Sequence, residues 1–133
     1  MEARLPTIAR LILYCAAALI ALGGLYDVFV PRLPPNLVAM CGGDERACKL
    51  ARELLRALGG SLVAVGATMA LLVSQLRFQG RAQTLMLVLL LVLPSEGINS
   101  LSMYRVSSPF LIPLFFTLLT LVGVLLAWPG LFY

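Results

Sequence analysis

Charge is scarce in this chain. Only 12% of its 133 residues are charged and 61% are hydrophobic, whereas an average soluble domain has roughly 25% charged residues. So few charges cannot cover the surface of a water-soluble protein of this length. The composition therefore excludes a soluble globular fold and indicates a membrane protein.

Several functional signatures are also missing. Histidine is absent, which removes the commonest acid/base at neutral pH and the commonest metal ligand. The sequence has no phosphate-binding loop, nucleophile elbow or metal motif. Its net charge is +4, but the arginines stand singly at the edges of apolar runs and form no basic patch. We therefore predict a non-enzymatic protein without a metal site, a catalytic residue or a nucleic-acid partner, and no cofactor can be named.

Long apolar runs are what the chain does contain. They occupy residues 11–30, 54–73, 85–93 and 110–128, and the third continues as a more polar segment to residue 104. A helix needs ~20 residues to cross a hydrocarbon core about 30 Å thick. We predict one all-α domain, an integral membrane four-helix bundle, with spans at about residues 8–30, 47–76, 82–104 and 109–128.

The N-terminus has two interpretations. Arg4 and Arg10 before an apolar run are typical of a secretory signal peptide, but this run continues to Val30 and is too long for a signal core. The residues before Cys15 also lack the small side chains of a lipoprotein cleavage site. We therefore expect a retained first span.

The charges give conflicting indications of topology. With four spans, the N-terminus, the second connection and the C-terminus lie on the same side of the membrane. A count of Lys and Arg alone favours placing that side outside. However, the Lys and Arg residues on the opposite side of the membrane are interleaved with acidic residues. The turn at residues 77–81 has two basic residues and no acidic one, as in a cytoplasmic hairpin. We therefore predict an N-in, C-in topology. Arginine greatly outnumbers lysine, which indicates a bacterial source, so we expect the membrane to be a bacterial cytoplasmic membrane.

Local signals shape the helices. Pro31 should end the first helix, and Asp44 should cap a second helix whose first turns project beyond the hydrocarbon. In the third helix, Pro94 and the polar residues after it predict a kink with local unwinding. Gly-Gly steps at residues 23–24 and 59–60 indicate helix packing. A ridge of small side chains on the second helix should also pack against a neighbour: Ala57, Gly60, Ala64 and Thr68.

Glu96 is the most unusual position, because a carboxylate inside a membrane is costly and normally faces a partner or water. At ~1.5 Å per residue it lies roughly 22 Å along the third helix from Arg81. The same measure places three polar residues at a similar level: Asp27, Arg56 and Asn99. Further polar side chains lie nearby: Arg52, Tyr26, Tyr104 and Arg105. We predict that these residues form a polar cluster in the outer half of the bundle.

The predicted polar cluster has two interpretations. Its central charges would sum to zero, which a buried network tolerates: Asp27, Glu96, Arg52 and Arg56. In the first interpretation these charges form a clamp that fixes the helix register and binds nothing. In the second they line a polar pocket, open outward, that binds a polar head group or passes protons.

Cys41 and Cys48 lie around the start of the second helix. If the first connection is outside the cytoplasm, they can form a disulfide. Free thiols and a redox centre are the alternatives, although the Cys-x6-Cys spacing has no redox signature and no metal-site spacing. Cys15 lies among alanines and is expected to be a small packing residue.

A family resemblance rests on residues 52–60, where an arginine leads into a Gly-Gly step. With the chain length and span pattern, this stretch resembles the second helix of the DoxX-like group of small bacterial four-helix membrane proteins. The resemblance implies structural roles for Arg56, Gly59 and Gly60, and it transfers no catalytic residue. Named DoxX relatives are associated with quinone-linked thiosulfate oxidation, so it also implies a link to membrane redox complexes.

Three functions follow from these patterns. The first is an accessory or ligand-binding membrane subunit whose polar cluster recognises a lipid, quinone-like or polar head group. The alternatives are a proton-coupled small-molecule transporter and a subunit of a membrane redox complex. Small multidrug transporters also have four spans, but their key glutamate lies in the first helix, which has none here. We expect a homo-oligomer or a larger membrane complex, because so short a chain buries little surface.

Overall fold

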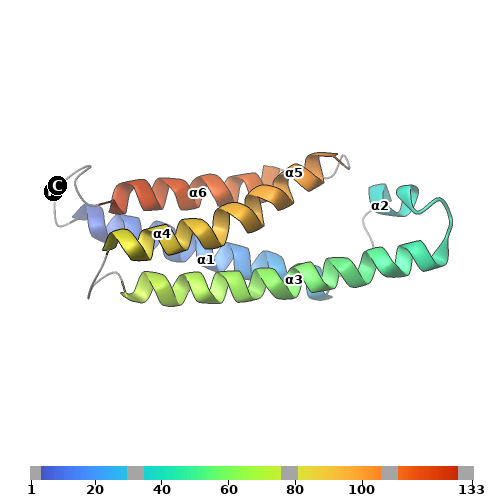
Figure 1. Cartoon of the computed structure of the whole chain (residues 1–133), viewed down its shortest axis with the longest axis horizontal. Coiled ribbons are helices and arrows are strands. Elements are labelled where there is room, and N and C mark those ends of the chain that lie inside the picture. Colours follow the sequence, from blue (N-terminus) through green and yellow to red (C-terminus); the bar gives the residue numbers. More distant parts are fainter. Residues whose placement is uncertain (1–3, 30–34, 76–80, 106–110, 129–133) are drawn as a thin grey trace.

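The computed structural model describes residues 4–29, 35–75, 81–105 and 111–128, and every regular element within them is helical. The all-α prediction is therefore confirmed. In chain order the elements are α1 (Arg4–Phe29), α2 (Pro35–Met40), α3 (Glu45–Ser74), α4 (Arg81–Val92), the π-helical η2 (Leu93–Gly97), α5 (Ile98–Arg105) and α6 (Leu111–Ala127). Because α4, η2 and α5 are contiguous, they form one long helix with a π-helical turn inside it (Figure 1).

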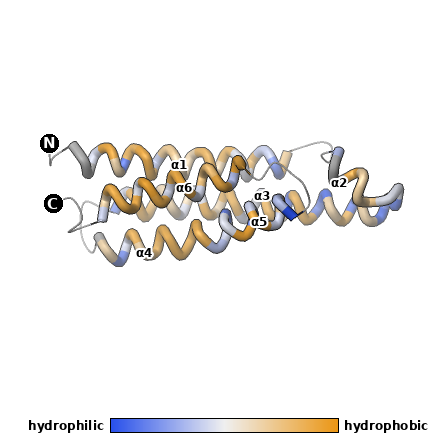
Figure 2. The backbone as a smooth tube through the Cα atoms, turned by 90° about the horizontal axis from the view of Figure 1, so that it is seen from above, coloured by the Kyte–Doolittle hydropathy of each residue, from blue (hydrophilic) through white to orange (hydrophobic). Residues whose placement is uncertain are grey.

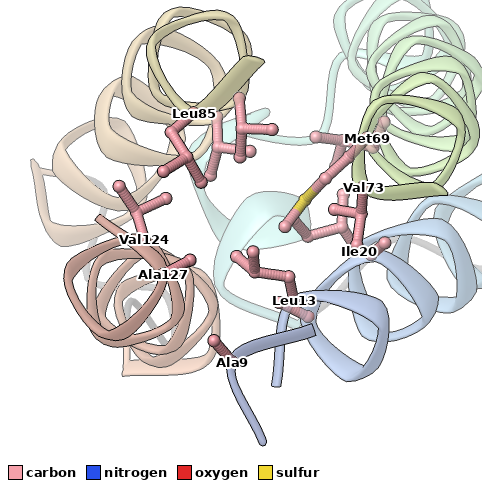
Figure 3. Close-up of a cluster of buried hydrophobic side chains, with 13 residues drawn as sticks. Ala9, Leu13, Ile20, Met69, Val73, Leu85, Val124 and Ala127 are labelled. Carbon is pink, nitrogen blue, oxygen red and sulfur yellow. The ribbon is translucent and has the colours of Figure 1, made fainter. Parts of the chain in front are cut away.

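The long helices lie side by side, and each runs antiparallel to the one before it (Figure 1). The start of α1 and the end of α6 lie at one end of the bundle, and α3 projects beyond its neighbours at the other end, with α2 beside it. In the axial view, α1, α3, α4 and α6 occupy four corners, with α1 and α4 on a diagonal (Figure 3). The most extensive contact is between α1 and α3, and the next is between α1 and α6.

Three helical segments are long and apolar enough to cross a membrane: Thr7–Phe29, Glu45–Ser74 and Ala82–Arg105. The shorter apolar helix α6 has 17 residues. Large apolar side chains face outward along the bundle, such as Leu11 and Leu90, each 64% exposed. Figure 2 shows apolar residues along the helices and hydrophilic residues gathered on the projecting end of α3. The three longer segments have the length and composition of membrane spans.

The helix bounds lie within a few residues of the predicted spans. The first helix ends at Phe29; Pro31, expected to end it, lies outside the described residues, as do residues 77–80 of the predicted basic turn. The prediction that Asp44 caps α3 is confirmed, because its carboxylate accepts hydrogen bonds from the backbone N–H groups of Arg46 at 2.9 Å and Ala47 at 3.5 Å. With 30 residues, α3 is about 45 Å long, which is longer than a hydrocarbon core of about 30 Å.

The centre of the bundle is apolar and receives side chains from each of the four corners. The buried side chains labelled in Figure 3 are Ala9, Leu13 and Ile20 of α1, Met69 and Val73 of α3, Leu85 of α4, and Val124 and Ala127 of α6. Two threonines of α6 are buried beside them, and each hydroxyl donates to a backbone carbonyl of its own helix at 2.9 Å. These hydroxyl groups therefore need no water in the interior.

The backbones of α1 and α3 touch at Gly24 and Gly59. A Cβ atom added to Gly24 would lie 2.5 Å from the carbonyl oxygen of Gly59, and one added to Gly59 would lie 2.5 Å from that of Gly24. Two turns further along, a Cβ on Gly66 would lie 2.7 Å from the carbonyl oxygen of Ala17 and 2.8 Å from the Cβ of Ala21. The prediction that the Gly-Gly steps serve helix packing is confirmed for Gly24 and Gly59.

The predicted small-residue ridge is not the face that α3 uses in this contact. All of its members are exposed, namely Ala57, Gly60, Ala64 and Thr68. A Cβ on Gly60 would meet no atom within 4 Å. The buried residues of α3 are instead Gly59, Leu62, Gly66, Met69 and Val73. Both faces carry small residues at helical spacing, so that spacing alone could not distinguish them.

The π-helical turn η2 lies where the sequence predicted a kink. Pro94 has no backbone N–H, so a carbonyl of the preceding turn loses its partner. Beside it, the hydroxyl of Ser95 donates to the carbonyl oxygens of Leu91 at 2.7 Å and Val92 at 3.2 Å. A π-helical turn is wider than an α-helical one and is often found at functional sites. Glu96 lies within this turn and is buried.

Replacing Gly59 with alanine should destabilise the bundle, whereas the same change at Gly60 should not. Gly59→Ala forces α1 and α3 apart, and overpacking of this kind costs about 1–3 kcal/mol. Gly60→Ala adds a methyl group in open space and gains up to about 1 kcal/mol of helix propensity. Thermal unfolding in detergent micelles, followed by circular dichroism, measures both. Equal unfolding midpoints for the two variants would contradict the contact.

Candidate functional site

Glu96 is the most deeply buried ionisable side chain among the described residues, with 1% of its surface exposed. The side chain of Asn99, three residues further along the same helix, lies close enough for a hydrogen bond with this carboxyl group. The carboxylate of Asp27 on α1 is close enough for its charge to act on Glu96. Asp27, Glu96 and Asn99 are thus polar groups of α1, η2 and α5 that interact electrostatically, and we call these three residues the carboxyl site.

The tight contact between α1 and α3 sets the position of Asp27. Asp27 is partly buried, and a Cβ atom added to Gly59 would lie only 2.9 Å from the Cβ of Asp27. The missing side chain at Gly59 therefore leaves the space that Asp27 occupies. A single glycine contact determines both how closely the two helices pack and where the first carboxyl group of the site stands.

Arg56 pairs with an acid on its own helix. Its Nη1 lies 3.0 Å from Oε1 of Glu53, and the two side chains are 45% and 55% exposed. Side chains three residues apart on a helix are neighbours, and an exposed pair keeps most of its hydration. Pairing with Glu96 instead would bury the guanidinium group, which carries a large desolvation penalty. The structure therefore pairs Arg56 with Glu53, and with neither Asp27 nor Glu96.

Arg52 lies one turn from Arg56 and is partly buried. Its Nε is buried and has no hydrogen-bond partner among the described residues. A buried donor without an acceptor is unfavourable, so Arg52 could hydrogen bond an incoming oxygen atom. Its place is on the projecting side of the α1–α3 contact, nearer to water than Asp27.

The remaining members of the predicted polar cluster lie on the outer surface. Tyr26 is 72% exposed and Tyr104 is 63% exposed. Arg105 is also exposed and ends α5, where a cation stabilises the negative end of the helix dipole. The structure therefore separates the predicted cluster into the interior carboxyl site, the two arginines of α3, and this outer group.

The cysteines occupy two different environments. Cys41 and Cys48 are free thiols of intermediate exposure and lie close enough for a side-chain hydrogen bond. The disulfide between them stays a prediction. Cys15 is exposed, so its expected role in packing is wrong. The buried positions of this part of α1 belong to Leu13, Ala16 and Ala17, which leaves Cys15 on the outward face.

An open groove of about 520 Å³ lies at the other end of α4. Its lining is Ala82, Gln83, Met86, Leu87 and Trp128. This lining is apolar apart from one amide and includes no residue of the carboxyl site. No group of three potential metal ligands gathers anywhere in the described part of the chain. The converging polar groups of the interior therefore lie at the carboxyl site.

Two supporting residues were not identified from the sequence. Glu53 holds Arg56 away from the interior, and its spacing of three residues from Arg56 was a sufficient signal. Ser95 supplies the hydrogen bonds beside Pro94, and a serine next to a proline inside a span could have indicated this role.

A scan against protein-family models found no matching family, and searches of curated proteins and of solved structures found no match either.

Removing the amide partner of Glu96 should cost more stability than removing the exposed ion pair. Asn99→Ala leaves a buried carboxyl group without its hydrogen bond, which costs about 1–3 kcal/mol. Arg56→Ala should change the free energy of unfolding by no more than about 0.5 kcal/mol. The double change Glu96→Leu with Asn99→Leu should recover part of the loss, since both polar partners are then removed. Unfolding titrations with SDS measure all three variants, and a large effect of Arg56→Ala with none from Asn99→Ala would reverse this order.

Proposed function

We propose that this protein is a non-enzymatic ligand-binding subunit with four membrane spans. In this proposal α6 is the fourth span, and the start of α1 and the end of α6 face the cytoplasm. The carboxyl site then lies in the outer half of the bundle, where it recognises the polar head group of a lipid or quinone-like ligand.

The composition of the carboxyl site supports ligand binding over a charge clamp. A clamp requires opposite charges in contact, because only paired charges compensate for their burial. Among the described residues, however, the groups that act on Glu96 are an amide and a second carboxyl group, Asn99 and Asp27. The nearby Arg56 is already paired with Glu53. Ionisable groups placed in this way inside a membrane protein usually serve a ligand or an ion pathway.

The chemistry of the side chains favours a ligand that donates hydrogen bonds. Carboxyl groups are predominantly acceptors, and the amide of Asn99 can both accept and donate. An ammonium group of a lipid or a hydroxyl group of a reduced quinone provides the matching donors. Asp27 is partly exposed and Glu96 is buried. Asp27 would therefore accept the first hydrogen bond from the ligand, and Glu96 would interact with the ligand deeper in the bundle.

Phosphatidylethanolamine should stabilise the purified protein more than phosphatidylcholine does. The two lipids share a phosphate group and acyl chains, but only the first has N–H donors. We expect a higher thermal midpoint in detergent with phosphatidylethanolamine, and loss of the difference in Asp27→Asn combined with Glu96→Gln. Arg56→Ala serves as the control and should retain it. A short-chain quinol tests the second donor class. If neither probe shifts the midpoint relative to phosphatidylcholine, the binding proposal fails.

Proton-coupled transport is a second candidate, favoured by the two neighbouring carboxyl groups of Asp27 and Glu96. Carboxyl groups inside membrane spans are the groups through which transporters relay protons. In this case the protein reconstituted into liposomes would dissipate an imposed pH gradient, and Glu96→Gln would abolish the flux. Arg56→Ala should retain it. Tight liposomes with the unaltered protein would exclude this candidate and leave ligand binding in place.

We also propose the DoxX-like group as the family of this chain, on the resemblance of residues 52–60. The packing of Gly59 against α1 supports a structural role for Gly59, the first glycine of that step.

The proposed orientation makes a separate prediction. If the start of α1 is cytoplasmic, Cys41 and Cys48 face the outside, and a membrane-impermeant maleimide should label them in intact, pre-reduced bacterial cells. The Cys41→Ser, Cys48→Ser double variant gives the background from Cys15. Labelling that appears only after the cells are permeabilised would place this end of the bundle in the cytoplasm and reverse the topology.

A further inference from the structure

Two cysteines lie on either side of the turn between α2 and α3: Cys41 follows α2 directly, and Cys48 lies in the first turns of α3. Gly42 and Gly43 adopt the left-handed conformation, with φ of 60° and 81°, which glycine tolerates best. The N–H of Asp44 donates to the carbonyl oxygen of Cys41 at 3.1 Å, and the N–H of Cys48 donates to that of Asp44 at 3.1 Å. This chain of hydrogen bonds sets the spacing of Cys41 and Cys48 across the turn.

The two thiols meet at the end of that turn. Both are free and partly exposed, and their side chains lie close enough for a hydrogen bond. This interaction, with smaller effects of burial and of the charges of Cys48 and Asp44, raises the pKa of the Cys41 thiol to about 11. Cys41 therefore keeps its proton at neutral pH and is not the attacking sulfur in the first step.

We propose that Cys41 and Cys48 form a redox-active dithiol that closes to a disulfide by exchange with an external disulfide and thereby fixes α2 on α3. In the first step the Cys48 thiolate attacks one external sulfur, forms a mixed disulfide and releases one external thiolate. Cys41 then gives its proton to solvent, attacks the Cys48 sulfur and releases the second external thiolate. The cysteine pair loses two electrons and two protons, and the external disulfide becomes two thiols.

The consequence of the bridge follows from how weakly α2 is held. This helix has only six residues, Pro35–Met40, and the helix it packs against is α3. Its apolar side chains Val38 and Met40 are 49% and 63% exposed, so little buried surface holds it in place. A disulfide from Cys41, the residue after α2, to Cys48 in the first turns of α3 would restrict movement of α2 away from α3. With the two thiols reduced, α2 would be free to move away from α3.

Oxidation of the purified full-length protein tests the bridge. The reduced protein in detergent is exposed to glutathione disulfide, the remaining thiols are alkylated, and peptides are identified by mass spectrometry. We expect a Cys41–Cys48 bridge in the unaltered chain and an unmodified Cys15, because thiol exchange needs an aqueous thiolate and Cys15 lies within the apolar span Thr7–Phe29. In Cys41→Ser, the glutathione adduct should persist on Cys48. Glutathione adducts on both Cys41 and Cys48 of the unaltered chain, or bridges between chains, would overturn the proposal.

Hydrogen exchange tests the effect on α2. The amides of residues 36–40 should exchange at least several-fold more slowly in the oxidised protein than in the reduced protein, and the exchange of α4 should not change. Cys48→Ser should show no response to the oxidant. A bridge that forms without slowing exchange in α2 would overturn the proposed role in fixing this helix.

Discussion

The backbone contact between α1 and α3 is the constraint on which the rest of the structure depends. Apolar side chains gain nothing by leaving lipid, so membrane helices associate chiefly through close van der Waals contact and a few hydrogen bonds. Gly24 and Gly59 permit that contact, because any side chain at either position would meet the backbone of the other helix. The contact fixes the register of the two helices, and it places Asp27 directly beside Gly59. The first carboxyl group of the site is therefore positioned by packing.

Most polar side chains of the bundle are satisfied by the backbone of their own helix. The hydroxyls of Ser61, Ser95, Thr117 and Thr120 each donate to a carbonyl oxygen about one turn before them. Such bonds are independent of neighbouring helices and carry no information about a ligand. Glu96 differs, because it is buried and interacts with the side chain of Asn99. The Nε atoms of Arg52 and Arg10 are also buried and have no partner among the described residues. Of these three, Glu96 lies deepest in the bundle and is the strongest functional candidate.

Properties that depend on one helix at a time could be predicted from the sequence, whereas pairings between helices could not. The length of α3, its cap at Asp44 and the irregular turn at Pro94 follow from local chemistry, and the structure contains all three features. The buried face of α3 was missed because the exposed ridge through Gly60 has the same small-residue spacing as the buried one through Gly59. Counting residues along helices placed Asp27, Arg56 and Glu96 at a similar depth, but it could not show that Arg56 would turn toward Glu53. Depth along a helix is a local property, and the direction of a side chain is not.

The length of α3 connects the carboxyl site with the cysteine pair. Gly59 is locked against α1, so the turns of α3 that exceed the membrane thickness must lie at its N-terminal end. Cys48 is eleven residues before Gly59, which corresponds to about 16 Å along the helix axis. This distance is enough to move from the level of Asp27 in the bundle to the projecting end that Figure 2 shows as hydrophilic. Thiol exchange requires an aqueous thiolate, whereas Glu96 is buried in the bundle and Asp27 is partly buried. The register of α3 against α1 therefore keeps the cysteine pair apart from the carboxyl site.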